Sequence, residues 1–192
     1  MAKLFVNYGA MGSSKTANLL ITQFNYLERG LNPLVLTSSI DDRSGVGIVA
    51  SRISGLKTEA IPIRTQDDIY KLIEQENNIK KVDVVLVDEA QFLTKEHVDQ
   101  LTDVVDILGI STITYCLRTD FQGNFFEGSK WLFAWADEIH EIKTMCDCDH
   151  KANFNARIVD GKIVKTGNQI QIGGNESYIA LCRKHWKIGR LK

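Results

Sequence analysis

The amino-acid sequence lacks four features that would each indicate a class of protein: a charge excess, a long apolar run, a secretion signal and internal repeats. Its 23 basic and 24 acidic residues give a net charge of −1, so no basic excess indicates a nucleic-acid partner. No run approaches the roughly 18 apolar residues of a membrane span. The first residues also lack the cleavage pattern of a signal peptide. We therefore expect a cytoplasmic protein with neither a membrane nor a nucleic acid as partner.

Cysteine is also scarce, and its distribution is uneven. Four cysteines occur among the 192 residues, and three of them lie in the last quarter of the chain near His185. Disulfide bonds are not expected in a reducing cytosol. Cys116 ends an apolar segment and is interpreted as a small core residue. The other three cysteines form a separate group near His185, which indicates a role other than packing in the core.

Strand-like and helix-like segments alternate through the first 143 residues. Strands are expected at 3–8, 33–37, 82–90, 111–116 and 137–143, and helices at 14–29, 65–77, 94–109 and 129–137. The order strand, helix, strand in the first 37 residues indicates a βαβ unit and a parallel sheet. Thr94 is the expected N-cap of its helix. Residues 38–58 are polar and contain several glycines, so we expect a mobile loop there.

The pattern changes after Met145. Short β-like pieces flank turns, and Asp160-Gly161 is a sequence typical of a tight β-hairpin. This change predicts a second, smaller unit at the C-terminal end of the chain.

The segment GAMGSSKT at residues 9–16 differs at one position from a phosphate-binding loop, which is glycine, four free positions and then Gly-Lys-Ser/Thr. Small residues let backbone N–H groups converge on phosphate oxygens, and the following helix adds its N-terminal dipole. In such a loop Lys15 neutralises the β- and γ-phosphates and Thr16 binds Mg²⁺. The expected strand before the loop and helix after it are the context that the motif requires. The alternative is a glycine-rich turn before a surface Lys-Thr pair.

Ser14 is the residue that departs from the motif, because it stands where glycine is usual. A Cβ atom penalises left-handed backbone dihedrals but not helical ones. If the helix already begins at position 14, serine fits there. Our hypothesis is that the nucleotide site is retained.

The segment VVLVDEAQF at residues 84–92 supplies the second element of a phosphate site, an apolar strand that ends in acids. Asp88 is expected to hold Mg²⁺, through water, opposite Thr16. Glu89 could take a proton from an attacking group. That group would be water in an ATPase and a substrate hydroxyl in a kinase, and the strand alone does not decide between them. A solvated strand end is the alternative to both.

The sequences CDC at 146–148 and CRKH at 182–185 bring together three thiols and one imidazole. This is a complete tetrahedral ligand set for structural Zn²⁺ and leaves no open position for a catalytic water. His150 would be a fifth ligand and is left out. Zinc at these positions would clamp the ends of the segment between them; the alternative is a set of unrelated surface thiols.

Five motifs follow one another along the chain: GAMGSSKT, DEAQFL, LRTDFQG, IGGNESY and the zinc quartet. Because they occur in the same order in the type II thymidine kinase family, the chain resembles that family. The Cys-x-Cys pair is similar to the enterobacterial and phage branch of that family. The resemblance implies a RecA-like α/β fold: a P-loop kinase domain with a parallel sheet over residues 1–143 and a zinc-binding subdomain with a lasso loop over 144–192. It also implies transfer of the ATP γ-phosphate to the 5′-hydroxyl of thymidine or deoxyuridine, in nucleotide salvage.

The resemblance also implies roles for individual residues. Glu89 matches the general base of the family. The residues that match its ATP site are Gly9, Ala10, Met11, Gly12, Ser13, Ser14, Lys15, Thr16, Asp88 and Gln91, with Thr16 and Asp88 on Mg²⁺. Those that match its nucleoside site are Phe121, Phe126, Ile170, Gln171, Ile172, Gly173, Gly174 and Tyr178, and those that match its zinc ligands are Cys146, Cys148, Cys182 and His185. Arg118, Asp41 and Arg43 match positions near the site. The family is usually a homotetramer restrained by thymidine triphosphate (dTTP), and we expect both properties here.

Two other functions remain open from the sequence. A RecA-like DNA-dependent ATPase would share the phosphate loop and the Asp-Glu strand end, although the near-neutral charge argues against it. A zinc-bearing binding module with a vestigial nucleotide site is supported by Ser14 alone.

Overall fold

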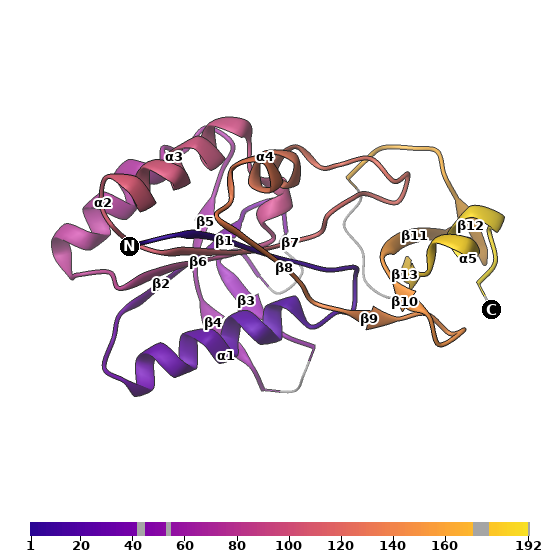
Figure 1. Ribbon diagram of the computed structural model, residues 1–192, viewed down its shortest axis with the longest axis horizontal. Coiled ribbons are helices and arrows are strands. Elements are labelled where there is room, and N and C mark those ends of the chain that lie inside the picture. The colour runs from indigo at the N-terminus through magenta and orange to yellow at the C-terminus, as the bar shows by residue number, and fades with distance from the viewer. Residues whose placement is uncertain (42–44, 53–54, 171–176, 192) are drawn as a thin grey trace.

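The computed structural model describes residues 1–41, 45–52, 55–170 and 177–191, and it shows three layers beside a smaller C-terminal region (Figure 1). A sheet forms the middle layer. Helices α2, α3 and α4 lie on one side of it and helix α1 lies on the other (Figure 1). The C-terminal region, residues 144–191, lies beyond one end of the sheet. This is the α/β architecture that the alternating segments predict.

Six parallel strands form the sheet, in the order β5-β2-β6-β7-β1-β8. Their bounds are Leu4–Tyr8 (β1), Pro33–Ser38 (β2), Ile61–Ile63 (β5), Val84–Asp88 (β6), Thr112–Cys116 (β7) and Glu138–Glu141 (β8). Strand β6 is buried along its whole length, as expected for an inner parallel strand. The carboxyl ends of parallel strands meet at one edge, so the segments that follow β1, β6 and β7 lie together there.

The helices of the three layers are α1 (Lys15–Glu28), α2 (Ile69–Ile79), α3 (Lys95–Asp106) and α4 (Glu127–Trp135). A short 3₁₀ helix, η1 (Ala90–Phe92), follows β6. Helix α2 begins later than expected because the Asp68 side chain caps it, accepting a hydrogen bond of 3.0 Å from the Lys71 N–H. Thr94 caps α3 as expected, with a bond of 3.1 Å from the His97 N–H.

Part of the segment expected to be a mobile loop is ordered. Strands β3 (Ile48–Ala50) and β4 (Lys57–Glu59) pair antiparallel, and Val49 is buried in the same core as Leu19 of α1. The expectation is therefore wrong for these residues, because strands of three residues are too short to show an alternating pattern. Residues 42–44 and 53–54 lie outside the described part of the chain. Strand β5 was also not expected; its Pro62 is tolerated because β5 is an edge strand.

The C-terminal region contains short strands and one helix. The strands are β9 (Thr144–Met145), β10 (Lys151–Ala152), β11 (Phe154–Val159), β12 (Lys162–Val164) and β13 (Tyr178–Leu181), followed by α5 (Arg183–Ile188). Asp160 and Gly161 join β11 to β12 with φ angles of 48° and 72°, which confirms the predicted hairpin turn. The buried cluster of this region is small and includes Cys146 and Cys182. A core of this size needs a further source of stability, which a bound metal would supply.

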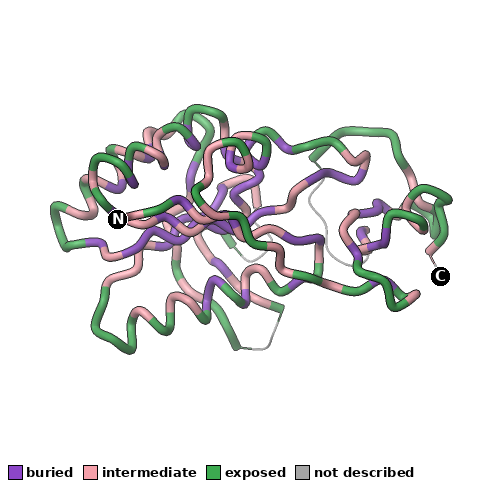
Figure 2. The backbone as a smooth tube through the Cα atoms, in the orientation of Figure 1, coloured by how far each residue is buried: buried purple, intermediate pink, exposed green. Residues whose placement is uncertain are grey.

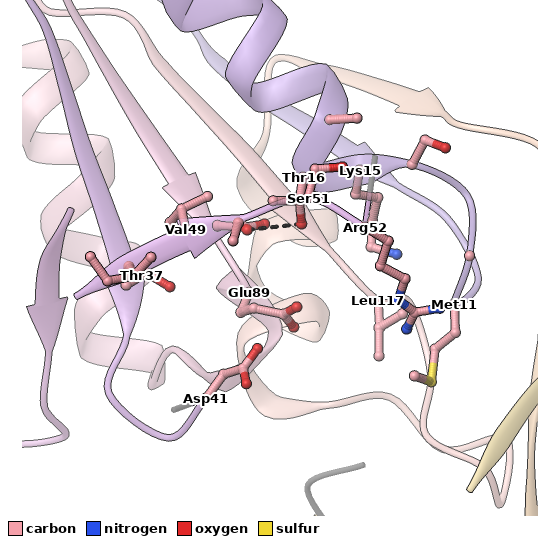
Figure 3. A pocket seen from close by; sticks show the side chains of 16 residues that line it. Met11, Lys15, Thr16, Thr37, Asp41, Val49, Ser51, Arg52, Glu89 and Leu117 are labelled. Carbon is pink, nitrogen blue, oxygen red and sulfur yellow. Dashed lines mark hydrogen bonds between the residues drawn. The ribbon is translucent and has the colours of Figure 1, made fainter. Parts of the chain in front are cut away.

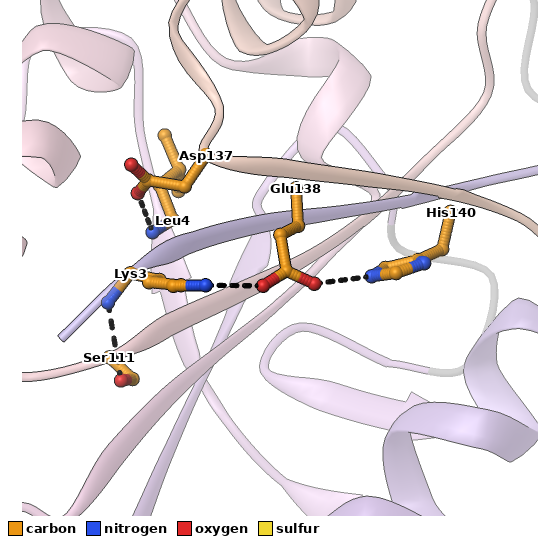
Figure 4. Close-up of polar contacts among 6 residues, drawn as sticks. All are labelled: Lys3, Leu4, Ser111, Asp137, Glu138 and His140. Atoms are coloured by element: carbon orange, nitrogen blue, oxygen red, sulfur yellow. Dashed lines mark hydrogen bonds and ion pairs between the residues drawn. The ribbon is translucent and has the colours of Figure 1, made fainter. Parts of the chain in front are cut away.

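The N-terminal strand is fastened to the edge of the sheet by polar contacts (Figure 4). Lys3 Nζ lies 2.6 Å from Glu138 Oε1, and His140 Nε2 lies 3.2 Å from the other oxygen of Glu138. The Leu4 N–H donates to Asp137 Oδ2 at 2.7 Å. Charged side chains on the edge strand β8 also oppose pairing with a strand of another molecule.

Burial is concentrated in the strands of the sheet, where the tube in Figure 2 is mostly purple. One core lies between the sheet and helices α2, α3 and α4, and a second lies between the sheet and α1. These two cores hold the carboxyl ends of the strands in fixed positions. Within the described residues, no helix is both long and apolar enough to traverse a lipid bilayer.

Candidate active site

Two cavities meet near the carboxyl ends of the strands. The larger has a volume of about 520 Å³ and is lined by the phosphate loop, β3 and the end of β6 (Figure 3). The smaller has a volume of about 60 Å³ and lies between residues 117–126 and the C-terminal region. Met11, Asp41, Glu89 and Leu117 line both cavities, so the two spaces adjoin. Figure 3 shows Glu89 and Asp41 pointing toward each other from different segments.

Lys15 is held within the phosphate loop. Its Nζ donates to the backbone oxygens of Ala10 at 3.0 Å and Gly9 at 3.3 Å. Burial lowers the pKa of Lys15 from its ordinary value, and the nearby carboxylates of Glu89 and Asp88 oppose that shift. A half-buried cation that has no ion pair with another described residue gains from the arrival of an anion, so this position suits a phosphate group.

Ser14 does not begin the helix, so the helix expected from residue 14 starts one residue later. It is the N-cap of α1 with φ 61° and ψ 29°, in the left-handed region, and α1 begins at Lys15. Position 14 therefore keeps the backbone conformation for which glycine is suited, and serine adopts it at a cost on the order of 1 kcal/mol. The loop retains its shape despite the serine.

Thr16 and Asp88 face each other at the base of the larger cavity. Thr16 Oγ1 donates to Asp88 Oδ2 at 3.0 Å, drawn as the dashed line in Figure 3. Burial, with a contribution from neighbouring Glu89, raises the pKa of Asp88 to about 7. Two oxygen ligands at this spacing fit a hard cation such as Mg²⁺, and its charge would favour the ionised carboxylate.

Glu89 leaves the strand in an unusual conformation. Its φ of 50° and ψ of 35° are left-handed, which turns the residue out of the line of β6 at the junction of the two cavities. Gln91 Nε2 donates a hydrogen bond to Glu89 Oε2, and Gln91 Oε1 accepts one of 3.0 Å from the Leu117 N–H. Gln91 was expected among the ATP residues. It is only 1% exposed, lines the smaller cavity and is bonded to Glu89.

Aromatic side chains dominate the smaller cavity. Phe121 and Phe126 are 1% and 6% exposed and line it, as do Phe92, Tyr178 and Ile170. Phe92 and Phe126 meet edge to face, with ring centroids 5.7 Å apart. A space enclosed by rings is suited to a flat aromatic ligand.

A buried arginine supports this wall from behind. The guanidinium of Arg157, on β11, lies 3.7 Å from the ring centroid of Phe121, and Arg157 is 3% exposed. Its Nε and Nη2 both donate to the Tyr178 hydroxyl, at 3.0 and 2.8 Å. Nη2 also reaches the Gln169 carbonyl at 3.4 Å. Among the described residues no carboxylate pairs with Arg157; its guanidinium is stabilised by the Phe121 and Tyr178 rings and by the Tyr178 hydroxyl.

Asp120 connects the loop before α4 to the C-terminal region. Its Oδ1 accepts from the N–H groups of Gln122 and Asn124 at 2.8 and 2.9 Å, which fixes the turn. Its Oδ2 accepts from Gln169 Nε2 at 2.9 Å. The two sides of the smaller cavity are therefore joined by a hydrogen bond between residues 49 positions apart.

Some residues expected at the site lie elsewhere. Gly9, Ala10 and Ser13 do not line the larger cavity, although they shape the loop around Lys15. Arg118 lies outside both cavities, with its guanidinium 5.7 Å from the Tyr8 ring centroid. Burial raises the pKa of Cys116 to about 12, consistent with an inert core thiol. Gln171, Ile172, Gly173, Gly174 and Arg43 lie outside the described residues.

The sequence analysis missed several residues of the smaller cavity or its support: Phe92, Asp120, Asn155, Arg157 and Gln169. Phe92 and Asp120 lie inside motifs that had already been recognised, so their position was a usable signal. The other three lie in the C-terminal region without a spacing or composition that marks them. Only the fold brings them to the cavity.

The zinc quartet is assembled in space. One ligand atom from each of Cys146, Cys148, Cys182 and His185 lies within 4.8 Å of the others. Cys148 Sγ is 3.7 Å from Cys182 Sγ, and Cys146 Sγ is 3.4 Å from His185 Nδ1. A tetrahedral Zn²⁺ with Zn–S bonds of about 2.3 Å has S···S edges of about 3.8 Å. The donor set and its spacing therefore fit zinc.

Comparisons with known proteins show the family of the chain. The family model described as thymidine kinase matches residues 2–186. A thymidine kinase from Haemophilus influenzae is 52% identical over 188 residues, which is 97% of each chain, and one from Pasteurella multocida is 51% identical over the same shares. Among solved structures, a Pif1 helicase from Candida albicans aligns with a TM-score of 0.43 and 16% identity, over 73% of this chain and 36% of that chain, a likeness that carries no functional argument. The chain belongs to the thymidine kinase family.

Proposed function

We propose that the chain transfers the γ-phosphate of ATP to the 5′-hydroxyl of thymidine, giving thymidine monophosphate and ADP in nucleotide salvage. ATP occupies the larger cavity and the nucleoside occupies the smaller one. The observation that carries this proposal is that Glu89 lines both cavities, with phosphate-loop residues on one side and aromatic rings on the other. The curated relatives are named thymidine kinases, which supports the same substrate.

The chemical step in this proposal uses few groups of the protein. The Glu89 carboxylate accepts the proton of the 5′-hydroxyl as the hydroxyl oxygen forms its bond to the γ-phosphorus. The bond between the γ-phosphorus and the bridging oxygen of ATP breaks, and ADP leaves with that electron pair. Gln91 holds the carboxylate of Glu89 in position through its hydrogen bond.

Geometry supports Glu89 rather than Asp88 as the proposed base. The pKa of Asp88, raised to about 7 by burial, is closer to that of an effective base at neutral pH. Asp88, however, lines only the larger cavity and is bonded to Thr16. A base must reach the proton that it abstracts, and of the two acids only Glu89 borders the nucleoside cavity.

Lys15, Thr16 and Asp88 serve the phosphates. Lys15 moves its charge from the loop carbonyls to the β- and γ-phosphates, where it stabilises charge in the transition state. Thr16 and Asp88 would hold Mg²⁺, which, when bound, neutralises negative charge on the phosphate oxygens. Both residues already face the larger cavity.

The zinc quartet has a structural part in the proposal. Its four ligands leave no open coordination position, so zinc would stabilise the C-terminal region without entering the reaction. We also propose the division into a nucleotide-binding domain over residues 1–143 and a zinc-binding subdomain over 144–192. The last strand of the main sheet, β8, ends at Glu141, which supports this boundary.

Feedback inhibition by dTTP is part of the same proposal. A thymine base in the smaller cavity and a triphosphate in the larger one would block both sites, because the cavities share a wall. Kinetics with each substrate varied in turn would test this, since a bisubstrate-like inhibitor competes with both ATP and thymidine. Competition with only one of the two would contradict it.

We further propose a homotetramer that acts in the cytoplasm. In support of assembly, helix α1 exposes Ile21, Phe24 and Leu27 at 52, 57 and 54% of their surface, an apolar patch that another copy could cover. The reduced thiols of the metal cluster suit a reducing compartment. Light scattering coupled to size-exclusion chromatography would measure the mass, and a monomeric mass would contradict the tetramer.

The activity is tested by measuring ADP release at fixed ATP and Mg²⁺ with thymidine, with deoxyuridine, with single-stranded DNA, or with no addition. We expect the nucleosides alone to stimulate release and thymidine monophosphate to appear in equal amount. Stimulation by DNA alone would select the ATPase alternative. ATP binding without ADP release in every arm would select a vestigial site.

A further inference from the structure

The Asn155 side chain joins three distant segments of the chain. Its Oδ1 accepts a hydrogen bond of 2.8 Å from the Met11 N–H in the phosphate loop, 144 residues away. Its Nδ2 donates one of 3.0 Å to the Thr119 carbonyl, in the loop before α4. Because an N–H must meet the oxygen and a carbonyl must meet the NH₂ group, only one orientation of the amide satisfies both partners. Asn155 is 4% exposed, so water does not replace these bonds freely.

The Asn155 side chain gives the Met11 N–H a hydrogen-bond acceptor that the phosphate loop itself does not provide. The loop contains left-handed residues at Gly12 and Ser14 and lacks the regular bonds of a helix or strand. Within the loop, Ser13 N–H donates to the Ala10 carbonyl at 3.3 Å, whereas the Met11 N–H finds its partner outside, in β11. Asn155 therefore fixes the half of the loop that comes before the strained residues.

The position of Asn155 depends in turn on the C-terminal region. Asn155 pairs with Ala180 in the register of β11 and β13, and β13 leads directly to Cys182 of the zinc quartet. A displacement of β11 would carry the amide away from Met11. The phosphate loop is thus tied to a region whose described residues make no other hydrogen bond to residues 9–16.

We propose that Asn155 is a positioning residue for ATP, through which the C-terminal region holds the phosphate loop in its binding conformation. Asn155 also lines the smaller cavity, so the alternative is that it acts only on the nucleoside. The inference rests on the proposed function, because it takes the larger cavity as the nucleotide site. It predicts that the C-terminal region affects nucleotide affinity even when no nucleoside is bound.

The test is the affinity for ADP in the absence of nucleoside, measured by calorimetry on the unmodified chain and on Asn155→Leu. Leucine has a similar size and removes both hydrogen bonds. We expect ADP to bind about tenfold more weakly, the effect of one buried hydrogen bond whose donor is left unpaired. Amide hydrogen exchange of the phosphate-loop peptide should also be faster in the unliganded variant, a local readout that a general loss of stability would not reproduce.

Asn153→Leu is the matched control. Asn153 lies two residues earlier, and its side-chain amide makes no hydrogen bond to the part of the chain that the structure describes. We expect this control to keep the ADP affinity and the exchange rate of the unmodified chain. If circular dichroism shows that Asn155→Leu is unfolded, the smaller change Asn155→Ala takes its place in the same two measurements.

The outcomes separate this inference from the proposed function. A folded Asn155 variant with unchanged ADP affinity and unchanged loop exchange overturns the inference, even if its thymidine KM is raised. Failure of the unmodified chain to phosphorylate thymidine would instead overturn the proposed function. Equal weakening of ADP binding in Asn155→Leu and Asn153→Leu would also overturn the inference, because it would show a general effect of the region.

Discussion

The two cavities that share Glu89 are built in opposite ways. The larger is lined mainly by short stretches of chain: residues 11–12, 14–17, 48–52 and 88–89 supply most of its wall. The smaller takes its residues from segments spread between positions 11 and 178, several of them as single side chains. The first is a local structure placed at the end of a sheet, and the second exists only when distant segments meet.

This difference has a chemical reason. Phosphate groups are recognised by backbone N–H groups, a helix terminus and one cation, all of which a single loop can present. A base is recognised by surfaces on several sides, which one loop cannot supply. The smaller cavity, proposed here for the nucleoside, accordingly uses Phe121 from one loop, Tyr178 from β13 and, behind both, Arg157 from β11.

The largest expected effect is at Glu89, which lines both cavities. Glu89→Gln keeps the shape of the side chain and removes its ability to accept a proton. We expect turnover to fall by at least about a hundredfold, the contribution of a general base, while ATP and thymidine still bind. Steady-state kinetics and calorimetry with each ligand would show this. Near-normal turnover would exclude Glu89 as the base.

The next largest effect is expected at the backbone of residues 90–93, which follows Glu89, because a change there should disturb both cavities together. A Cβ atom added at Gly128, in α4, would lie 2.4 Å from the Ala90 carbonyl oxygen and 2.8 Å from that of Leu93. Gly128→Ala should therefore push α4 away from η1 and destabilise the fold by roughly 1–3 kcal/mol, as overpacking does. Thermal unfolding measures this, and kinetics should show weaker use of both substrates.

Gly161→Ala is a suitable comparison for Gly128→Ala. Gly161 lies in the β11–β12 hairpin turn, and no atom lies within 4 Å of a Cβ added there, although its φ of 72° disfavours alanine. Both variants should lose some stability, but only Gly128→Ala should impair ATP and thymidine use together. Loss of a single substrate in Gly128→Ala would show that the two cavities do not depend on a common backbone.

The contrast between local and distributed construction also explains what could be predicted from the sequence. The sheet, its helices and the Thr94 cap follow from periodicity and capping residues, which are local signals. The phosphate loop and the Asp88-Glu89 strand end follow from motifs. Residues 48–50 and 61–63 could not be predicted in the same way, because such short strands form only against partners that the fold supplies.

Ser14 and Arg157 show the limits of that prediction. The helix expected from Ser14 begins at Lys15 instead, because the dihedral angles of a loop are set by its surroundings, here by Lys15 bonding the carbonyls of Gly9 and Ala10. Arg157 gave no signal because a lone arginine in a strand resembles a surface residue in sequence. Its burial against Phe121 depends on contacts between segments that are far apart in the chain.

Arg157→Met should have a smaller effect, confined to the smaller cavity. The change keeps much of the side-chain volume but removes the cation over Phe121 and the two donors to the Tyr178 hydroxyl. A desolvated cation–π contact contributes about 2 kcal/mol or more, so we expect the thymidine KM to rise at least about tenfold. The KM for ATP should stay nearly unchanged, because Arg157 does not line the larger cavity.

Lys162→Met is the control for this change. It also replaces a cation in the C-terminal region, but Lys162 is exposed on β12. Both KM values of this control should match those of the unmodified chain. If Arg157→Met raises the KM for ATP as much as that for thymidine, the separation of the two cavities would be wrong.

The smallest expected effects are confined to the larger cavity and arise in the phosphate loop. Ser14 and Gly12 both have left-handed backbones, with φ of 61° and 75°, and no atom lies within 4 Å of a Cβ added at Gly12. Ser14→Gly removes backbone strain and Gly12→Ala adds it without a clash, so the two variants change the strain of the loop in opposite directions.

If the free loop relaxes from this conformation, nucleotide binding must restore it at a cost on the order of 1 kcal/mol. Ser14→Gly should then bind ATP about fivefold more tightly and Gly12→Ala about fivefold more weakly, with the thymidine KM unchanged in both. Calorimetric ATP affinities measured beside thermal unfolding would decide. A higher unfolding temperature for Ser14→Gly with the same ATP affinity would show that the free loop already holds the strained conformation, and that the strain affects folding rather than binding.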